Sequence, residues 1–594
     1  MKFCPDCGGR LRVSRRGPSV CPSCGHRATG GRTGGDGDTL LGSFPYPSMR
    51  PFQREVLEQV ESALSSGKRF VALEAPVGFG KSALAAALCN YLRSAYIVTS
   101  TKQLQDQYSA DFGYTVVKGK PNFRCLVPSS TGAHLPCNKG RCEVDWKLSD
   151  CSHYLSFEQY DQHKKHQCTR NSKCEHLKRG ELCPYYEQKW ESFRAPVTVC
   201  NYPFFLSELR YADDLPHRRL LVCDEAHDLE KQLVAFASFS LRRSVVQMYH
   251  DPVVGGGGTV QDVVIPDGGG DDPSAWLGAL SEARRTLDEF CDLHVEDFGM
   301  QDKVATCKST LDSLERFTKD LTSSPENWVV NGVRRSTDGL VEEVVFQPID
   351  VGAYAGPLFG TADATLLMSA TIFSPSLLCR TLGMDEKDVQ FVSVPRSIFP
   401  VENRPILALN VAQLSQASMA TALESVARAV DRIMERHASE RGVIHTTSYQ
   451  QVNYIMQHVS EASRARLVTT EGTFERSVLL AIHGSTDASV LISPSLYQGV
   501  DLKDDLSRFQ VVVKVPYPDL SDRRTRIKLE RDRSWYDWQT ALRLVQTYGR
   551  SVRSETDHAV TYVLDSNFTR FVNGHRELFP TYFLDALADP ATVA

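Results

Sequence analysis

An apolar strand, a glycine-containing turn and an Ala- and Leu-rich helix follow one another in residues 69–92, RFVALEAPVGFGKSALAAALCNYL. The chain is expected to bend through Gly78 and Gly80 and then to enter the helix. In such a phosphate-binding loop, backbone N–H groups of the turn and of the helix N-terminus face the phosphates of a nucleotide. Lys81 would reach the β- and γ-phosphates, and the Ser82 hydroxyl would bind Mg²⁺.

The strict loop pattern, G-x4-G-K-[ST], has glycine where this chain has Ala75, so a fortuitous glycine-rich turn is the alternative. A second segment favours the nucleotide site. RRLLVCDEAHDL contains a predicted strand that ends in Asp224 and Glu225, followed by His227. A carboxylate at the C-terminal end of a strand, beside the loop, is where the Mg²⁺ ligand belongs. The two segments together predict an α/β NTPase that uses ATP and Mg²⁺, with Glu225 orienting the attacking water.

Further segments resemble the motifs of superfamily 2 helicases and follow in the order of that family. DEAH, residues 224–227, looks like motif II. Residues 50–60 resemble the family's lead-in helix before motif I. Five further segments resemble motif Ia (98–108), motif III (366–372), motif IV (442–449), motif V (493–502) and motif VI (546–554). The resemblance covers the chain from about residue 49 onward. It implies two RecA-like P-loop motor domains.

The resemblance assigns roles to individual residues. Arg550 and Arg553 are three apart on one predicted helix face, where two guanidinium groups could reach the γ-phosphate across a domain cleft. The implied catalytic set is Asp224, Glu225, Gln546, Arg550 and Arg553. The implied ATP-binding set is Gln53, Ala75, Pro76, Val77, Gly78, Phe79, Gly80, Lys81 and Ser82. The implied coupling set is His227, Ser369, Thr371, Gly499 and Asp501.

Seven of the seventeen cysteines are gathered within residues 125–183, between motif Ia and motif II. In XPD-like and DinG-like helicases an iron–sulfur domain occupies this gap. KGKPNFRC, which ends at Cys125, resembles the segment of the first ligand, and CPYYEQKW, which begins at Cys183, resembles that of the last. A [4Fe–4S] cluster takes four thiolates, so the resemblance implies Cys125 and Cys183 as two of its ligands.

Five cysteines compete for the two middle ligand places. We favour Cys168 and Cys174, because C-x5-C shortly before CPYY is a common arrangement in the family; Cys137 and Cys142 are the alternates, and Cys151 could replace one of them. The surplus cysteines could be free thiols or could bind Zn²⁺ through Cys137, Cys142, Cys151 and His153. A zinc-stapled insertion is the alternative interpretation of the whole region, since four cysteines also suit Zn²⁺.

The N-terminal segment carries CPDC and CPSC. Two such turns can place Cys4, Cys7, Cys21 and Cys24 tetrahedrally around one Zn²⁺, as in a zinc ribbon. The glycine-rich residues 30–38 read as a flexible linker.

The motifs divide the chain into expected domains. We expect the zinc ribbon at 1–28, a linker at 29–44, motor domain 1 at 45–120, 191–235 and 351–399, the iron–sulfur domain at 121–190, a helical arch-like insertion at 236–350 and motor domain 2 at 400–594.

The formal net charge of −5 excludes a globally basic nucleic-acid binder, so a nucleic-acid footprint must be local. Residues 161–180 and 523–533 are the two basic stretches, although solvated helix faces would explain either one. The sequence has no apolar run of eighteen residues, so no contact with a membrane is expected. It shows no secretory signal, so we expect a reducing, cytoplasmic location.

The sequence therefore predicts a monomeric, ATP-dependent DNA helicase of the XPD/DinG-like group. The resemblance implies 5′→3′ movement on single-stranded or forked DNA, with DNA-repair or replication proteins as partners. One alternative is a nucleic-acid-stimulated ATPase that remodels protein–DNA or RNA structures. The other is a non-catalytic DNA-binding scaffold with a decayed motor, against which the intact Lys81, Glu225 and Arg550 argue.

Overall fold

A computed structural model gives the structure of the protein. It describes residues 19–20, 27–28, 39–128, 132, 134–140, 142, 151–165, 181–211, 215–249, 270–294, 300–394, 396–414, 419–469, 476–494, 502, 504–552 and 554–592. Near the N-terminus, β1 (Ser19–Val20) pairs with β2 (Arg27–Ala28) in antiparallel fashion. Among the described helices, none is long and apolar enough to cross a membrane.

Motor domain 1 is built on a seven-stranded parallel sheet. Its strand order is β12 (Val389–Ser393), β3 (Phe70–Glu74), β11 (Ala362–Ser369), β7 (Arg218–Asp224), β4 (Ala95–Thr99), β6 (Val197–Asn201) and β5 (Thr115–Val116). The central strands read as nearly continuous apolar runs because helices bury both faces of the sheet.

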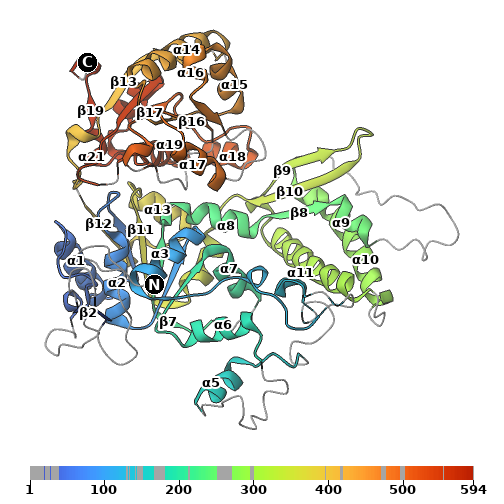
Figure 1. The fold of residues 1–594 in the computed structure, drawn as a ribbon. Helices are drawn as coiled ribbons and strands as arrows, with labels where there is room; N and C mark the ends of the chain where they lie inside the picture. The colour runs from blue at the N-terminus through green and yellow to red at the C-terminus, as the bar shows by residue number, and fades with distance from the viewer. Residues whose placement is uncertain are drawn as a thin grey trace.

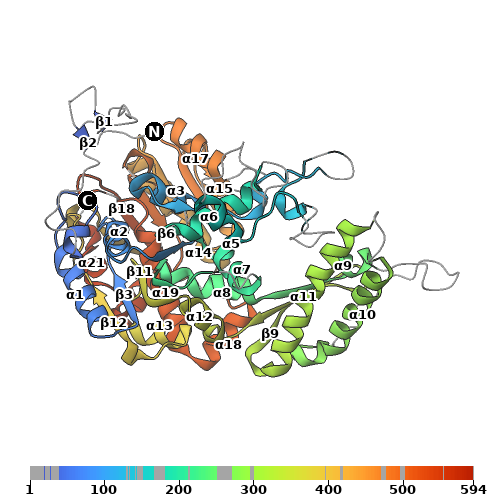
Figure 2. The same cartoon turned by 90° about the horizontal axis from the view of Figure 1, so that it is seen from below.

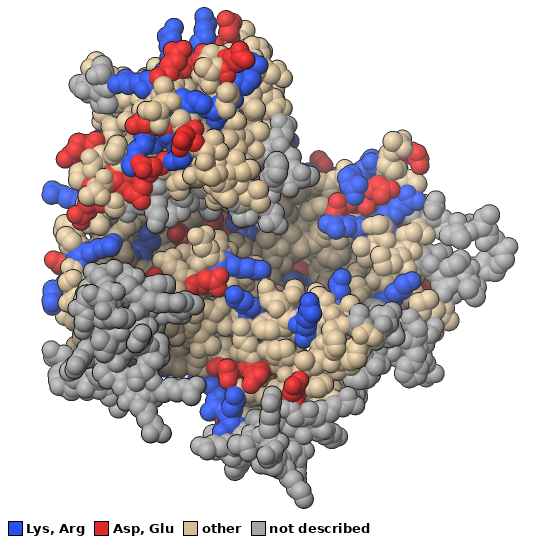
Figure 3. Space-filling model, viewed as in Figure 1, with Lys and Arg blue, Asp and Glu red and all other residues tan. Residues whose placement is uncertain are grey.

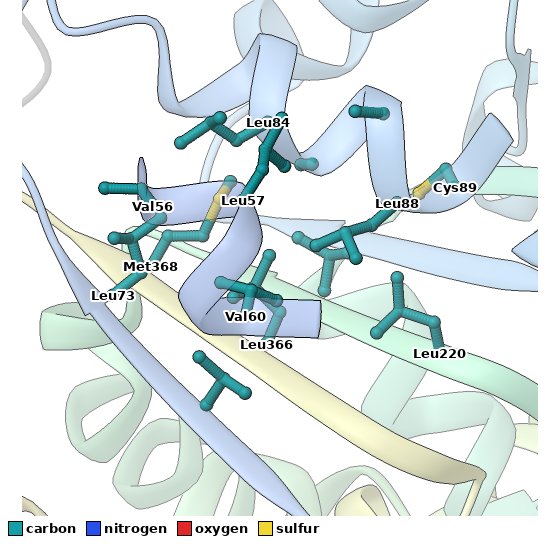
Figure 4. Packing of buried hydrophobic residues seen from close by; sticks show 14 of the residues in the cluster. Val56, Leu57, Val60, Leu73, Leu84, Leu88, Cys89, Leu220, Leu366 and Met368 are labelled. Atoms are coloured by element: carbon teal, nitrogen blue, oxygen red, sulfur yellow. The ribbon is translucent and has the colours of Figure 1, made fainter. Parts of the chain in front are cut away.

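Side chains alternate between the two faces of this sheet. Val71 and Leu73 of β3 pack under α1 (Gln53–Ser65) and α2 (Lys81–Leu92), together with Leu366 and Met368 of β11 (Figure 4). The intervening residues Phe70 and Ala72 join a second cluster on the other face. That face is covered by α7 (Tyr202–Tyr211), α8 (Leu229–Ala237), α12 (Gly352–Phe359) and α13 (Pro375–Leu382). The period of two is that of a strand buried on both sides.

Motor domain 2 repeats the architecture. Its parallel sheet has the order β15 (Leu467–Thr469), β16 (Val490–Ser493), β14 (Gly442–His445), β17 (Phe509–Val512), β18 (Val560–Asp565), β13 (Ile406–Ala412) and β19 (Leu587–Ala588). Its helices are α14 (Met419–Arg436), α15 (Tyr449–His458), α16 (Glu461–Arg464), α17 (Arg476–Ser485), α18 (Arg523–Arg531), α19 (Arg533–Tyr548), α20 (Asn567–Gly574) and α21 (Thr581–Leu584). The predicted α/β fold with two RecA-like domains is confirmed.

The insertion between motifs II and III is not purely helical, which corrects the prediction. Besides α9 (Arg243–Met248), α10 (Leu277–His294) and α11 (Gln301–Ser323), it contains an antiparallel sheet of β8 (Phe239–Arg242), β10 (Val341–Pro348) and β9 (Trp328–Arg335). Strands β9 and β10 form a hairpin, and Val341, Val344 and Phe346 face a core under the two long helices. Helical periodicity does not predict this hairpin, because apolar residues in a strand repeat every two positions.

The cysteine-rich segment lies beside motor domain 1. It contains α5 (Phe157–Lys165), and α6 (Pro184–Arg194) leads back into the motor domain through β6. Figure 1 shows motor domain 2 above motor domain 1, with α10 and α11 projecting to one side and α5 and α6 below. Figure 2 shows the same parts from below, with α18 beside β9. On the face in Figure 3, basic and acidic side chains are interspersed and the surface is hollowed between motor domain 2 and the insertion.

Candidate nucleotide site

Three strands of motor domain 1 bring the predicted motifs to one edge of the sheet. In the parallel ladders, Ser369 at the end of β11 pairs with Glu74 at the end of β3, and Met368 pairs with Asp224 at the end of β7. Motifs I, II and III therefore begin side by side at the carboxyl ends of the strands. Open parallel sheets bind their ligands at this edge.

The loop after β3 has the backbone of a phosphate-binding loop. Gly78 and Gly80 both have left-handed φ values, +80° and +90°. A Cβ added to Gly80 would lie 2.6 Å from Nε2 of Gln53, so glycine is needed there for space as well. The same Nε2 donates to the Phe79 carbonyl at 2.7 Å, and Lys81 Nζ donates to the Ala75 carbonyl at 3.1 Å. Gln53 thus holds the loop, although it lies in the preceding helix.

Asp224 is buried and hydrogen-bonded at both oxygens. The Glu225 backbone N–H donates to Oδ1 at 3.0 Å, and the Tyr108 hydroxyl donates to Oδ2 at 3.0 Å. Burial raises the pKa of Asp224 to about 7, and the neighbouring Glu225 charge adds to the rise while Lys81 opposes it. A buried carboxylate facing another carboxylate is electrostatically costly, and a divalent cation bound between them would relieve that cost.

Motif III is held by residues from motifs I and II. His227 Nδ1 lies 2.8 Å from Oγ of Ser369, and the same Oγ accepts the Thr371 N–H at 2.9 Å. Glu74 accepts the backbone N–H of Ile372 at 2.9 Å and that of Phe373 at 2.5 Å. The predicted coupling residues His227, Ser369 and Thr371 are therefore connected. Glu74 is a residue that sequence reasoning missed, although it directly precedes the predicted loop.

Motor domain 2 supplies the opposite wall. Nε2 of Gln546, near the end of α19, lies 3.4 Å from Oγ1 of Thr371, and Arg550 lines the same space. The charge of Arg550 adds to the effect of burial in lowering the pKa of His445, in motif IV, to about 3. Motifs I, II, III and VI thus enclose one nucleotide cleft of about 570 Å³. That volume is in the range of ligand sites in proteins.

Two residues of the connection between the motor domains also line the nucleotide cleft, and sequence reasoning missed both. The Phe399 ring packs on the loop, because a Cβ added to Gly78 would fall 2.1 Å from it. Arg404 is buried and donates to the Tyr548 hydroxyl at 2.9 Å. No spacing pattern marks either residue in the sequence.

Several predicted site residues lie outside the described part of the chain. They are Arg553 of motif VI, Gly499 and Asp501 of motif V, Cys168 and Cys174, and the four N-terminal cysteines Cys4, Cys7, Cys21 and Cys24. Their roles stay predictions.

Five cysteines of the insertion between motifs Ia and II line one small cavity, here called the cysteine cavity: Cys125, Cys137, Cys142, Cys151 and Cys183. Cys183 is the N-cap of α6, and its pKa falls to about 6, mainly through a hydrogen bond with Cys137, while backbone N–H groups of Tyr186 and Tyr185 contribute. A thiolate at a helix N-terminus is a good metal ligand.

Among the described residues, no group of three or more His, Cys, Asp and Glu side chains is arranged to hold a single metal ion. The alternative zinc set of Cys137, Cys142, Cys151 and His153 therefore does not form a single-ion site, and His153 Nδ1 is engaged with the Glu181 carbonyl at 2.8 Å. The structure thus gathers the predicted first and last ligands with the alternate middle cysteines, without showing a metal centre.

Comparison with known proteins agrees with this geometry. Residues 96–246 match the DEAD_2 family, and residues 432–583 match a family described as the helicase C-terminal domain. A probable ATP-dependent helicase of Methanocaldococcus jannaschii is 27% identical over 214 residues, an alignment that spans 32% of this chain and only 30% of that protein.

The fold is similar to solved structures over most of the chain. An XPD helicase superposes with a TM-score of 0.60 at 17% identity, covering 90% of this chain and 99% of that one. Xpd4 of S. tokodaii gives a TM-score of 0.56 at 17% identity, covering 89% and 99%. Two segments of the chain thus match helicase-family domains, and its fold is similar to that of an XPD helicase.

Proposed function

We propose that this protein is an ATP-dependent DNA helicase that moves 5′→3′ on single-stranded DNA. The observation that carries the proposal is the nucleotide cleft, in which Gly78 and Glu225 of motor domain 1 face Gln546 and Arg550 of motor domain 2. Asp224 interacts electrostatically with both Glu225 and Lys81. A nucleotide bound there would contact both domains, so its hydrolysis would change the interface between them. DNA as substrate and the direction of movement rest on the resemblance to XPD-like and DinG-like helicases.

Each residue of the nucleotide cleft has a role that its position supports. Backbone N–H groups at the start of α2 would cradle phosphates, and Lys81 would exchange its bond to the Ala75 carbonyl for phosphate oxygens. Ser82 and Asp224 would hold Mg²⁺, which supplies charge neutralisation at the phosphates. Glu225 would orient water, and Arg550 with Arg553 would stabilise charge that develops in the transition state.

We also propose that the cysteine cavity holds a [4Fe–4S] cluster. A cluster of this kind takes four thiolates spread around a cube of iron and sulfur, so its ligands need not converge on one point as those of Zn²⁺ do. The residues fit the group: Cys125 and Cys137 are buried, and a Cβ at Gly140 would fall 2.9 Å from Cys125 Sγ, so glycine leaves room beside that thiol. The fit supports Cys137 with Cys142 or Cys151 as the middle pair.

Metal content would decide the middle pair. We expect anaerobically purified protein to be brown, with about four iron atoms per chain, and with zinc held by the N-terminal cysteines. Replacing Cys137 and Cys142 by serine should remove the iron, whereas replacing Cys168 and Cys174 should retain it. The reverse result would restore Cys168 and Cys174 as ligands. Zinc alone, with no visible chromophore, would refute the iron–sulfur proposal.

Strand displacement tests the function directly. We would compare 5′-tailed, 3′-tailed and blunt duplexes while following ATP turnover in the same reactions. The proposal expects unwinding of the 5′-tailed duplex only, with hydrolysis stimulated by single strands. Hydrolysis without unwinding of any duplex would favour a remodelling ATPase, and no hydrolysis would favour a scaffold with a decayed motor.

A further inference from the structure

A buried acid one turn beyond motif II binds motor domain 2. Glu230 lies in the first turn of α8, three residues after His227, and is 7% exposed. Its Oε1 accepts from Arg524 Nη2 at 2.5 Å and lies 3.5 Å from Lys528 Nζ, both on α18. Its Oε2 accepts from Trp535 Nε1 at 3.0 Å and from Gln539 Nε2 at 3.4 Å, both on α19. These five residues are called the Glu230 cluster.

The same helix α18 is also fixed to the insertion. Asn331 of β9 accepts the backbone N–H of Arg523 at 2.9 Å and donates to Asp522 at 2.8 Å. Arg524 donates to the carbonyls of Pro348 at 2.8 Å and Ile349 at 2.9 Å. Motor domain 1, motor domain 2 and the insertion therefore meet at α18, which both ribbon views show beside β9.

This finding changes the interpretation of residues 523–533, one of the two basic stretches. Arg524 and Lys528 are buried, and both lie against the Trp535 ring as well as against Glu230. They are not available to phosphates, and they do not form a solvated face either. Their charge is used inside the protein, where both hold Glu230 and Lys528 also binds Asp350 at 3.2 Å.

The contacts between the motor domains differ in kind along α19. At its N-terminal end, the Glu230 cluster is charged and buried. Trp538, which lies between Trp535 and Gln539, donates from Nε1 to the Ile372 carbonyl at 2.7 Å, and near the C-terminal end of α19 Gln546 lies 3.4 Å from Thr371 at the nucleotide cleft. These later contacts are neutral hydrogen bonds. From Trp535 to Gln546 the helix rises roughly 16 Å, at about 1.5 Å per residue.

Charge decides which end of the interface separates more easily. Burial alone would raise the pKa of Glu230, but the charges of Arg524 and Lys528, with the bonds from Arg524 and Trp535, hold it below its ordinary value. The carboxylate is therefore ionised at neutral pH. Separating the domains here would break three hydrogen bonds to one charged carboxylate, whereas at the cleft it would break a single long contact between neutral groups.

We propose that the Glu230 cluster is the fixed pivot on which motor domain 2 turns, and that Glu230 is the residue that positions α19 so that Arg550 can reach the nucleotide. The nucleotide cleft opens and closes while the Glu230 cluster stays shut. Glu230 touches no nucleotide and acts through α19. The kinetic consequences rest on the proposed ATPase function, whereas the pivot itself concerns only how motor domain 2 moves.

Hydrogen exchange measured by mass spectrometry tests the motion on the unaltered protein. Peptides covering 229–237 and 523–531 should exchange equally in the nucleotide-free protein and with ADP–beryllium fluoride and single-stranded DNA. Peptides covering 543–552, at the nucleotide cleft, should become protected. If 523–531 changes with nucleotide as much as 543–552 does, the pivot is refuted, whatever the protein's ATPase activity proves to be.

Kinetics of matched variants test the positioning role. Glu230→Gln should lower the stimulated kcat for ATP by about tenfold or more and change KM for ATP by less than about threefold, because the binding loop is elsewhere. Arg524→Gln should lower kcat similarly. The double variant should have a kcat no lower than that of the less active single variant, since it leaves no unpaired charge. Additive losses, or an effect confined to KM, would overturn the role.

The control is an exposed ion pair between the same two domains. Arg380 of α13 lies 3.2 Å from Asp532, at the start of α19, and the Arg380 side chain is 59% exposed. Arg380→Gln should leave both kcat and the exchange of 523–531 unchanged, because exposed pairs contribute little. If Arg380→Gln lowers kcat as much as Glu230→Gln does, burial is not the reason for the effect. If the unaltered protein hydrolyses no ATP, the proposed function fails while the exchange result still decides the pivot.

Discussion

Replacing Asp224 by asparagine should stabilise the metal-free protein while abolishing ATP hydrolysis. The folded state holds this carboxyl with a pKa of about 7, against 3.8 for a free aspartate side chain. That difference corresponds to at most about 4 kcal/mol of destabilisation when the group is fully ionised. Asparagine can keep the bonds to the Glu225 N–H and the Tyr108 hydroxyl, since its amide offers an acceptor to the first and a donor to the second.

The effect has a defined pH dependence. Because the pKa is raised on folding, the folded state binds the proton more tightly, so stability is highest below pH 3.8 and is lost as pH rises through about 7. Asparagine does not titrate. The gap in melting temperature between Asp224→Asn and the unaltered protein, measured in EDTA, should therefore widen from pH 5.5 to 7 and then level off. Mg²⁺ with a nucleotide analogue should reverse the order, because only the aspartate can bind the cation as a charged ligand.

Two results would refute this reasoning. One is an asparagine variant that melts no higher than the unaltered protein at pH 8 without metal. The other is a gap that does not change between pH 5.5 and 8. Asp487→Asn is the control, because Asp487 is fully exposed near Arg441 and its replacement should leave the melting temperature unchanged at every pH.

Three further substitutions separate the parts of the nucleotide cleft. Lys81→Ala should abolish hydrolysis and unwinding while single-strand binding, followed by fluorescence anisotropy, survives; full ATPase activity would contradict the assignment. Arg550→Ala should lower kcat on the order of 10³-fold with a smaller change in KM, whereas a pure KM effect would indicate binding only. Glu74→Ala should lower the melting temperature of motor domain 1, since it leaves two backbone N–H groups without acceptors at about 1–3 kcal/mol each; unchanged melting would show that water replaces the carboxylate.

The parts of the cleft that sequence could predict are those whose chemistry is local. A phosphate-binding loop needs its glycines, lysine and hydroxyl within eight residues, and the acidic pair must follow a strand directly. Gln53 lies outside the loop, and it belongs to the predicted set because residues 50–60 resemble the lead-in helix of the family. Glu74 was missed although it is adjacent, because its partners, the N–H groups of Ile372 and Phe373, are almost three hundred residues away.

The choice of the middle cysteines also depends on how separate segments approach one another, and it stays a prediction. The resemblance to XPD-like and DinG-like helicases favours Cys168 and Cys174, which lie outside the described residues. The structure brings Cys137, Cys142 and Cys151 to the cavity shared with Cys125 and Cys183. Gly140 permits this approach, because any side chain there would collide with the Cys125 thiol. Such a steric requirement involves two segments at once, and neither segment reveals it alone.

Motif III contacts both the acidic motif II of the nucleotide cleft and helix α19 of motor domain 2. Its Ser369 is bound by His227, which follows the predicted catalytic Glu225 by two residues, so a change at the γ-phosphate side reaches the loop through one hydrogen bond. The same loop accepts Trp538 of α19 through the Ile372 carbonyl. The N-terminal end of α19 is meanwhile fixed by Glu230. Near the C-terminal end of α19, Gln546 lies 3.4 Å from Thr371 of the same loop, so a shift of the loop would turn the helix about its N-terminal end and would carry Arg550 toward or away from the nucleotide.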